Sequence, residues 1–183
     1  VEEVYTSRSG GAARAVYVEG LRNVVAEYAD RASPPDRLVY TSSTGVYGDH
    51  DGAFVGEGTP IDPRTENTRV LAEAERVAIE GAADAGIDGT VARFAGLYGP
   101  DRYRLDRYLE GPVTQGYLNM VHRDDAAGAV AFCLDADAAR EAVVVVVDDE
   151  PVDKWAFADW LAAECGVDAP PKRTTAERLA DPE

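Results

Sequence analysis

Arg37 to Asp49 reads RLVYTSSTGVYGD, and this stretch decides the fold. Its first half, through Tyr40, holds β-branched and aromatic residues, while its second half holds hydroxyl residues and glycines. The stretch therefore predicts a strand that ends in an exposed turn. Upstream, apolar residues between Val16 and Tyr28 recur at helical spacing, which predicts a helix over Ala13 to Asp30.

Downstream of this strand the alternation of helices and strands continues. Thr65 to Ala85 predicts a second long helix, and Gly89 to Phe94 (GTVARF) predicts another strand. The later elements expected are a short helix over 104–110, a short strand over 118–121, a helix capped by Asp124 and running to about Leu134, a strand over 143–147 and a helix over 153–165. The five consecutive valines at 143–147 indicate a strand buried on both faces. Strands separated by helices of this length predict an α/β fold with a parallel sheet.

The composition restricts the kinds of partner. The chain has 183 residues, of which 45% are apolar, enough for a buried core. Its formal net charge is −16, which argues against a nucleic-acid partner and offers no basic patch to a membrane surface. Of its 18 basic residues only Lys154 and Lys172 are lysines. This balance is typical of a halophilic protein, but also of an ordinary acidic protein from a GC-rich genome.

Targeting segments and metal motifs are not apparent in the sequence. No apolar run approaches the roughly 20 residues that span a bilayer, and no secretory signal is visible, which predicts a soluble cytoplasmic protein. Cys133 and Cys165 lie in apolar helical runs without metal-ligand spacing. They are predicted to be buried structural thiols, and no metal site is expected.

Four motifs follow one another along the chain. They are TSSTGVYGD at 41–49, an acidic-x-Thr-Pro group at 57–60, RFAGLYGP at 93–100 and VHRDDAAGA at 121–129. Together they resemble the extended short-chain dehydrogenases/reductases, most closely the atypical branch that is similar to NAD-dependent epimerases and dehydratases. The resemblance covers about Val1 to Pro151. It implies a Rossmann-type doubly wound parallel sheet. Residues 1–150 would form the C-terminal part of this domain, with a substrate-side insertion at 101–121. Residues 151–183 would form a partial substrate-side region.

The resemblance also implies a part of the fold that this sequence does not contain. In the family, the first strand and a glycine-rich turn bind the cofactor pyrophosphate at a helix N-terminus. Gly10 and Gly11 form a doublet without the third glycine, and they follow Val1 to Thr6, which corresponds to the fourth strand. We therefore expect three strands, the glycine-rich turn and the residue that selects NAD or NADP to precede Val1 in a longer chain.

The catalytic residues of the family are only partly present. The resemblance implies that Ser43 donates a hydrogen bond to a substrate oxygen, with capping of the following turn as the alternative. Family enzymes also use a Tyr-x-x-x-Lys pair, in which the lysine lowers the pKa of the tyrosine. Counting back from Ala74-Glu75 places Asn67 and Leu71 at these two positions, and a shift by two residues offers Thr65 and Arg69. Neither pair supplies a phenolate and a lysine.

Three other side chains near strand ends are possible acid–base groups. Tyr47 and Tyr98 belong to Val-Tyr-Gly and Leu-Tyr-Gly motifs, which favours structural roles for both. His122 lies two residues before Asp124 in a motif where, by resemblance, the histidine orients a loop. Catalytic roles are therefore the less favoured interpretation for all three.

The implied cofactor is NAD or NADP. Thr6, Ser7, Thr41 and Ser42 end the fourth and fifth strands of the family fold, so they are predicted neighbours of the cofactor ribose, with structural turn roles as the alternative.

The turn at Ala95, Gly96 and Leu97 is predicted to approach the nicotinamide, since it follows a strand and glycine permits close backbone contact. Gly96 stands where sugar-nucleotide epimerases have asparagine, which weakens the prediction of a nucleotide-sugar substrate.

These observations leave two main functional hypotheses. The first is an NAD(P)-dependent epimerase, dehydratase or reductase that acts on a small hydroxyl- or carbonyl-bearing substrate, nucleotide sugars included. The second is a dinucleotide-binding sensor or scaffold without turnover, which Asn67 and Leu71 favour. A third is that this stretch binds no dinucleotide, because the phosphate-binding part lies elsewhere. Helices 13–30 and 65–85 correspond to those that pair in family dimers, so a homodimer is predicted, with simple coverage of the sheet as the alternative.

Overall fold

The computed structural model describes residues 10–103 and 105–180 and divides the chain into two compact units. Unit 1 comprises Val1–Ala95 and Asp125–Val146, and unit 2 comprises Gly96–Asp124 and Val147–Glu183. The strand predicted for 1–6 lies outside the described residues.

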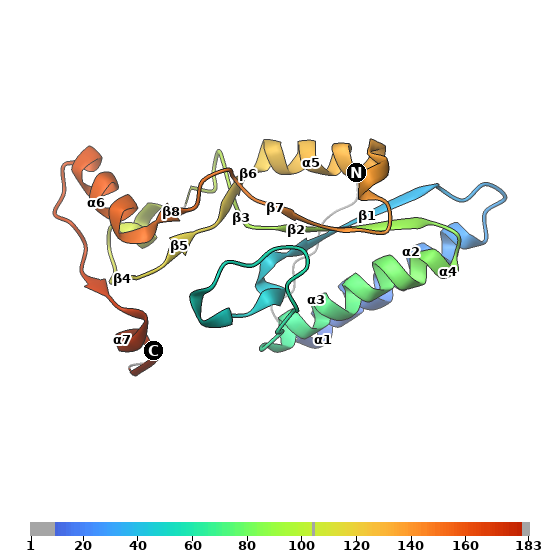
Figure 1. Ribbon diagram of the computed structural model, residues 1–183, viewed down its shortest axis with the longest axis horizontal. Coiled ribbons are helices and arrows are strands. Elements are labelled where there is room, and N and C mark those ends of the chain that lie inside the picture. Colours follow the sequence, from blue (N-terminus) through green and yellow to red (C-terminus); the bar gives the residue numbers. More distant parts are fainter. Residues whose placement is uncertain (1–9, 104, 181–183) are drawn as a thin grey trace. The chain divides into compact units, whose positions relative to one another are not determined.

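Unit 1 alternates helices and strands along the chain (Figure 1). Its elements are α1 (Gly10–Arg14), η1 (Ala15–Glu19), α2 (Gly20–Ala29), β1 (Arg37–Ser43), η2 (Thr44–Tyr47), η3 (His50–Gly52), α3 (Glu66–Arg76), η4 (Val77–Gly81), α4 (Ala82–Asp84), β2 (Asp88–Phe94), α5 (Arg123–Asp135), η6 (Asp137–Ala139) and β7 (Val143–Val146). The long helices predicted over 13–30 and 65–85 are thereby confirmed, each with a π-helical turn in its middle.

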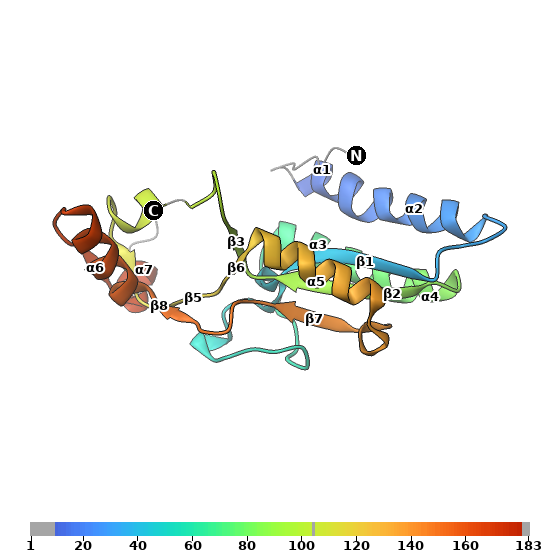
Figure 2. The same ribbon diagram turned by 90° about the horizontal axis from the view of Figure 1, so that it is seen from above.

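In the described part of unit 1 the centre is a three-stranded parallel sheet, with the strand order β1-β2-β7. In its register Arg37 lies opposite Asp88, and Ser43 lies opposite Phe94. Helices α1 to α4 lie on one side of these strands and α5 lies on the other, as Figures 1 and 2 show. The predicted α/β architecture, a parallel sheet with helices on both faces, is confirmed.

The core beneath the two long helices comes from small and β-branched residues. Ala13 and Val18 of the first helix meet Val70 and Ala74 of the second, and all four are buried. Tyr40 of β1 packs against this cluster from the sheet. Small residues let the helices approach closely, so they form a continuous layer over the sheet.

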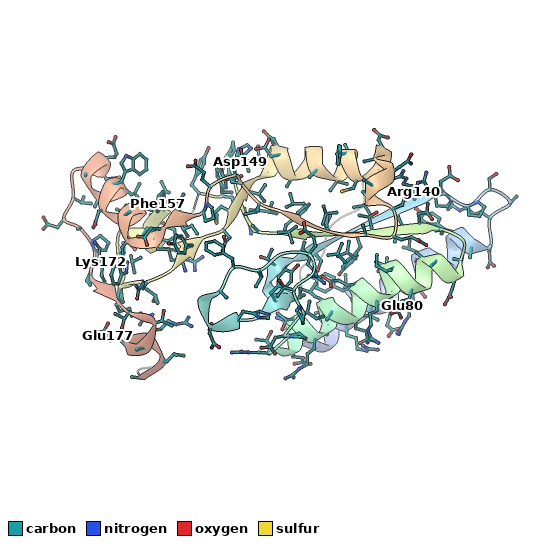
Figure 3. All side chains as sticks on the ribbon, viewed as in Figure 1. Glu80, Arg140, Asp149, Phe157, Lys172 and Glu177 are labelled. Carbon is teal, nitrogen blue, oxygen red and sulfur yellow. The ribbon has the colours of Figure 1, made fainter. Side chains whose placement is uncertain are left out.

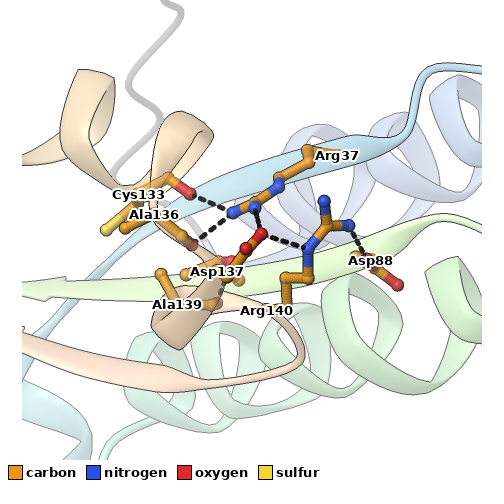
Figure 4. Close-up of polar contacts among 8 residues, drawn as sticks. Arg37, Asp88, Cys133, Ala136, Asp137, Ala139 and Arg140 are labelled. Atoms are coloured by element: carbon orange, nitrogen blue, oxygen red, sulfur yellow. Dashed lines mark hydrogen bonds and ion pairs between the residues drawn. The ribbon is translucent and has the colours of Figure 1, made fainter.

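Polar contacts tie the amino end of the sheet to the end of α5 (Figure 4). The guanidinium of Arg37 donates to the carbonyl oxygens of Cys133 and Ala136, at 3.0 and 2.5 Å. It also pairs with Asp137, which Arg140 contacts in turn, and Arg140 pairs with Asp88 at the start of β2. Arg37 thus supplies donors to the last helical carbonyls and places positive charge at the negative end of the helix dipole.

The valine strand differs from its prediction. All four residues of β7 are half-buried and not buried on both faces. The reason is that β7 is the last strand of the sheet among the described residues. Glu57, from the loop after η3, accepts a hydrogen bond from the backbone N–H of Val145 at 3.0 Å. This loop contact satisfies part of an otherwise unpaired strand edge.

The described part of unit 2 consists of short strands, a four-residue 3-10 helix and two α-helices. Its elements are β3 (Gly96–Tyr98), η5 (Leu105–Tyr108), β4 (Val113–Thr114), β5 (Tyr117–Leu118), β6 (Met120–His122), β8 (Val152–Asp153), α6 (Lys154–Cys165), β9 (Lys172–Arg173) and α7 (Thr175–Ala180). Strands pair as β3 with β6, β4 with β9 and β5 with β8. The single strand predicted over 118–121 is therefore two strands with different partners.

Two further predictions about local structure were wrong. Helix α5 begins at Arg123, and the ring nitrogen Nδ1 of His122 accepts a hydrogen bond from the backbone N–H of Asp124, at 3.3 Å. Asp124 is thus inside the helix and does not cap it. Cys133 is buried as predicted, but Cys165 is exposed at the end of α6.

Among the helices of 10–103 and 105–180, none is both long and apolar enough to cross a bilayer.

Candidate functional site

Ser43 is the last residue of β1 and caps the short helix that follows. Its Oγ accepts a hydrogen bond from the backbone N–H of Gly45 at 3.1 Å. Because the oxygen serves as acceptor in this bond, its O–H is available to donate. The residue is half-buried, so a ligand at the carboxyl end of β1 can reach it. Both roles considered for Ser43, capping and donation, are therefore compatible.

The first turn of α3 lies beside this serine. A side chain at Gly45 would lie 3.4 Å from the Ser43 Oγ and 3.8 Å from the methyl group of Thr68. Thr65 caps the helix, and its side chain and that of Thr68 bond each other's backbone N–H groups in a capping box. The helix start is therefore held firmly next to Ser43.

The residues at the tyrosine and lysine positions belong to the start of α3. Asn67 is exposed in the first turn, and Leu71 is half-buried one turn later. In the alternative register, Thr65 is the helix cap and the guanidinium of Arg69 donates to the carbonyl of Arg64. Neither register brings a phenol or an ammonium group to the first turns of this helix.

Thr41 and Ser42 point to opposite faces of β1. Thr41 is exposed, whereas Ser42 is buried and its hydroxyl donates to Oε1 of Glu75 at 2.6 Å. The contact that Ser42 makes is thus structural, and the ribose contact predicted for it stays a prediction. Thr6 and Ser7 lie outside the described residues.

Glu75 and Arg93 form a buried ion pair behind Ser42. Arg93 Nε and Nη2 donate to the two carboxylate oxygens at 3.0 and 2.7 Å, and both side chains are 7% exposed. Burial alone would lower the pKa of Arg93, but the hydrogen bonds with Glu75 hold that pKa above its ordinary value. The guanidinium also lies over the ring of Tyr47, 4.7 Å from its centroid. Tyr47 is thus part of the structural core, as its motif indicated.

Sequence reasoning missed this network, although a signal was present. Glu75 is a charged residue among the apolar positions Leu71, Ala74 and Ala78 of an amphipathic helix. Arg93 is likewise a charged residue in an apolar strand. A charge within a buried pattern calls for a partner of opposite sign, so the two could have been paired.

The turn after β2 belongs to both units. Ala95 is buried, and its backbone N–H donates to the carbonyl oxygen of Val146 in unit 1. In unit 2, the backbone N–H of Gly96 donates to the carbonyl oxygen of Asn119. A Cβ atom at Gly96 would lie 2.6 Å from the sulfur of Met120. Gly96 thus permits a close approach of β3 and β6. The nicotinamide contacts predicted for Ala95, Gly96 and Leu97 stay predictions.

Tyr98 and His122 meet within unit 2. Their rings pack edge to face with centroids 5.3 Å apart. Because the His122 Nδ1 accepts from the Asp124 N–H, the ring is held at the start of α5. His122 thus contacts the first turn of the helix, and the loop-orienting role that the resemblance implied for it stays a prediction.

The carboxyl end of β1 fits one part of a dinucleotide. Exposed Thr41 and half-buried Ser43 present hydroxyls that suit the hydroxyls of a ribose or the carboxamide of a nicotinamide. Open parallel sheets bind ligands at this end of their strands. The sequence has no G-x-G-x-x-G turn, so the residues present fit the ribose and nicotinamide, not the pyrophosphate.

Comparison with known proteins identifies the family. Residues 12–147 match the model of the NAD dependent epimerase/dehydratase family. The chain belongs to this family. Protein YeeZ of Escherichia coli K12 is 34% identical over 133 residues, which make up 71% of this chain and 46% of YeeZ. The chain thus spans about half the length of this relative.

Solved structures of epimerase/dehydratase relatives agree with the fold. A protein from Methylobacillus flagellatus, described as an NAD-dependent epimerase/dehydratase, is 29% identical with a TM-score of 0.71, over 93% of this chain and 66% of its own. DesIV of Streptomyces venezuelae, a dTDP-glucose 4,6-dehydratase with NAD bound, has a TM-score of 0.73 at 20% identity, over 95% of this chain and 59% of its own. The resemblance in the four motifs is thereby confirmed, and so is the Rossmann-type fold.

Proposed function

We propose that this chain forms part of an NAD(P)-dependent epimerase, dehydratase or reductase that acts on a small hydroxyl- or carbonyl-bearing substrate. The observation that carries the proposal is the placement of Ser43. It ends a parallel strand of a family sheet, accepts from Gly45 and keeps its O–H available at the ligand-binding end.

The proposed chemistry divides between cofactor and protein. NAD or NADP, when bound, accepts or returns the hydride. Ser43 donates a hydrogen bond to the substrate oxygen, which stabilises the negative charge that develops there. Thr41 is exposed, which supports the proposal that its hydroxyl binds the nicotinamide ribose.

The proton step is where this chain departs from its family. Asn67 can hydrogen-bond a substrate but cannot take its proton at neutral pH, and Leu71 has no charge. Positioned acid–base catalysis contributes about 10²- to 10⁴-fold, so we expect slow turnover compared with enzymes that keep the tyrosine and lysine.

Calorimetric titration of the intact protein with NAD and with NADP tests the cofactor. A scan of small alcohols and ketones for reduction or oxidation of the nicotinamide, followed by ultraviolet absorbance, then tests the reaction. The proposal predicts saturable binding of one dinucleotide and measurable turnover. Tight binding without turnover on any substrate would instead support the sensor or scaffold hypothesis.

We also propose that the two long helices of unit 1 mediate a homodimer. A groove of about 410 Å³ runs between them, and both apolar and charged residues line it, among them Val25, Val77, Arg22 and Glu80. Val16 and Val24 of the first helix are 41% and 38% exposed. Sedimentation should give a dimer at micromolar concentration in high salt, and a monomer there would contradict this proposal.

A further inference from the structure

Unit 2 contains a cavity whose walls are largely apolar and include five aromatic rings. Its volume is about 350 Å³, in the range of small-molecule sites. Phe157 of α6, labelled in Figure 3, lies between two other lining rings, with centroids 5.2 Å from Tyr108 and 5.9 Å from Trp160. Tyr98 and Tyr103 also line the cavity, together with apolar residues such as Leu118, Met120 and Leu161.

Several of these rings remain open to solvent. Trp160 is 55% exposed and Tyr103 is 51% exposed. The cost of leaving such large apolar surfaces in water is recovered when a ligand covers them. The cavity is therefore suited to a ligand with a flat or branched apolar body.

Among the described residues 10–103 and 105–180, the charged residues that line the cavity are both acidic, Asp148 and Glu150. Asp148 is half-buried, and its backbone N–H donates to the carbonyl oxygen of Met120. This bond fixes the backbone at the start of the acidic segment 148–150. Neither carboxylate forms an ion pair with a basic residue of the described chain.

We propose that this cavity binds an organic cation, an ammonium group attached to an aromatic or branched apolar body. Aromatic faces attract cations through their quadrupole, and the two carboxylates add direct attraction. The inference rests on the proposed function in that it names the substrate class: an amine that also carries the hydroxyl or carbonyl group to be oxidised or reduced.

The same features disfavour a nucleoside diphosphate in this cavity. A diphosphate brings at least two negative charges, which Asp148 and Glu150 repel. The nucleotide-sugar substrates named for relatives such as DesIV therefore do not fit the chemistry of these walls.

Binding of three matched probes tests the proposal. Phenethylamine, phenethyl alcohol and 3-phenylpropionate share a phenyl ring and differ in charge, and UDP-glucose represents the nucleotide sugars. Titrations of the intact protein are followed by calorimetry and by tryptophan fluorescence, since Trp160 lines the cavity. We expect phenethylamine to bind at least about fivefold more tightly than the alcohol, and the carboxylate and UDP-glucose to bind more weakly than the alcohol.

Variants of the two carboxylates test whether this order of probe affinities arises in the cavity. Asp148→Asn and Glu150→Gln should each weaken amine binding by roughly fivefold and leave alcohol binding unchanged. Asp168→Asn, an exposed carboxylate outside the cavity, should change neither. Equal or tighter binding of 3-phenylpropionate or UDP-glucose, amine binding unaffected by both cavity variants, or no binding of any probe would overturn the proposal.

The readout separates this inference from the proposed function. Probe binding requires neither turnover nor a dinucleotide, so a protein without redox activity can still show the predicted order. Conversely, a reversed order in a protein that turns over with NAD(P) would remove the substrate class and leave the oxidoreductase proposal intact.

Discussion

The two ends of the sheet in unit 1 are built differently. At the amino end, Arg37 donates to carbonyl oxygens at the end of α5 and pairs with Asp137. Arg140 pairs with the same aspartate and with Asp88. At the carboxyl end, Thr41 and Ser43 present neutral hydroxyls. We propose from this contrast that the amino end serves stability and that the two hydroxyls of the carboxyl end serve ligand binding, since open parallel sheets bind ligands there. Substitutions at the two ends should therefore have different effects.

The largest loss of stability is expected near the carboxyl end, at the buried ion pair of Glu75 with Arg93, the penultimate residue of β2. Glu75→Ala leaves the Arg93 guanidinium buried and unpaired, which should lower the free energy of unfolding by about 3–5 kcal/mol. Urea unfolding measures this loss. Glu80→Ala, an exposed carboxylate on the same helix, is the matched control and should change little. A loss below about 1 kcal/mol for Glu75→Ala would mean that the pair contributes little to stability.

A smaller loss is expected at the amino end. Arg37→Ala removes the donors to Cys133 and Ala136, and should cost about 2 kcal/mol of unfolding free energy without altering dinucleotide affinity. Arg31→Ala, which removes an exposed ion pair with Glu27, should cost less than about 0.5 kcal/mol. Reduced NAD(P) affinity in folded Arg37→Ala protein would break the contrast between the ends.

The loop contact at the sheet edge should be sensitive to acid. The hydrogen bond from Val145 holds the pKa of Glu57 below its ordinary value of 4.5. A depressed pKa means that the stabilisation is complete above 4.5 and is lost as the pH falls through the lower value of the folded state. Glu57→Gln should therefore cost up to about 1 kcal/mol at neutral pH and nothing in strong acid. A difference from wild type that is independent of pH would show that the charge of Glu57 is not involved.

Much of the fold could be predicted from sequence, because its signals are local. Helical spacing, the β-rich RLVYTS run and the four motifs place the long helices, two strands and the family. The burial of β7 could not be predicted, since its neighbours in the sheet depend on the whole fold and a valine run looks alike at an edge and in a centre. The contact of His122 with the start of α5 was not predicted either, because aspartate is the more usual capping residue.

The candidate site was only partly predictable. The position of Ser43 follows from its motif, whereas the different roles of Thr41 and Ser42 depend on which face of β1 meets Glu75. The cavity of unit 2 was not predicted at all. Phe157 and Trp160 lie on the helix predicted over 153–165, but only the packing shows that they line an open space.

The most direct measurement compares nicotinamide-dependent turnover of Ser43→Ala with that of wild type, at a temperature where both are folded. Loss of the Gly45 contact should cost only about 0.5 kcal/mol of stability. Loss of the donor to the substrate oxygen should lower kcat by about 10²-fold. Ser33→Ala, in an exposed loop, should match wild type in both respects. Equal turnover of Ser43→Ala and wild type would contradict the account, because the carboxyl end of β1 would then have no part in the chemistry.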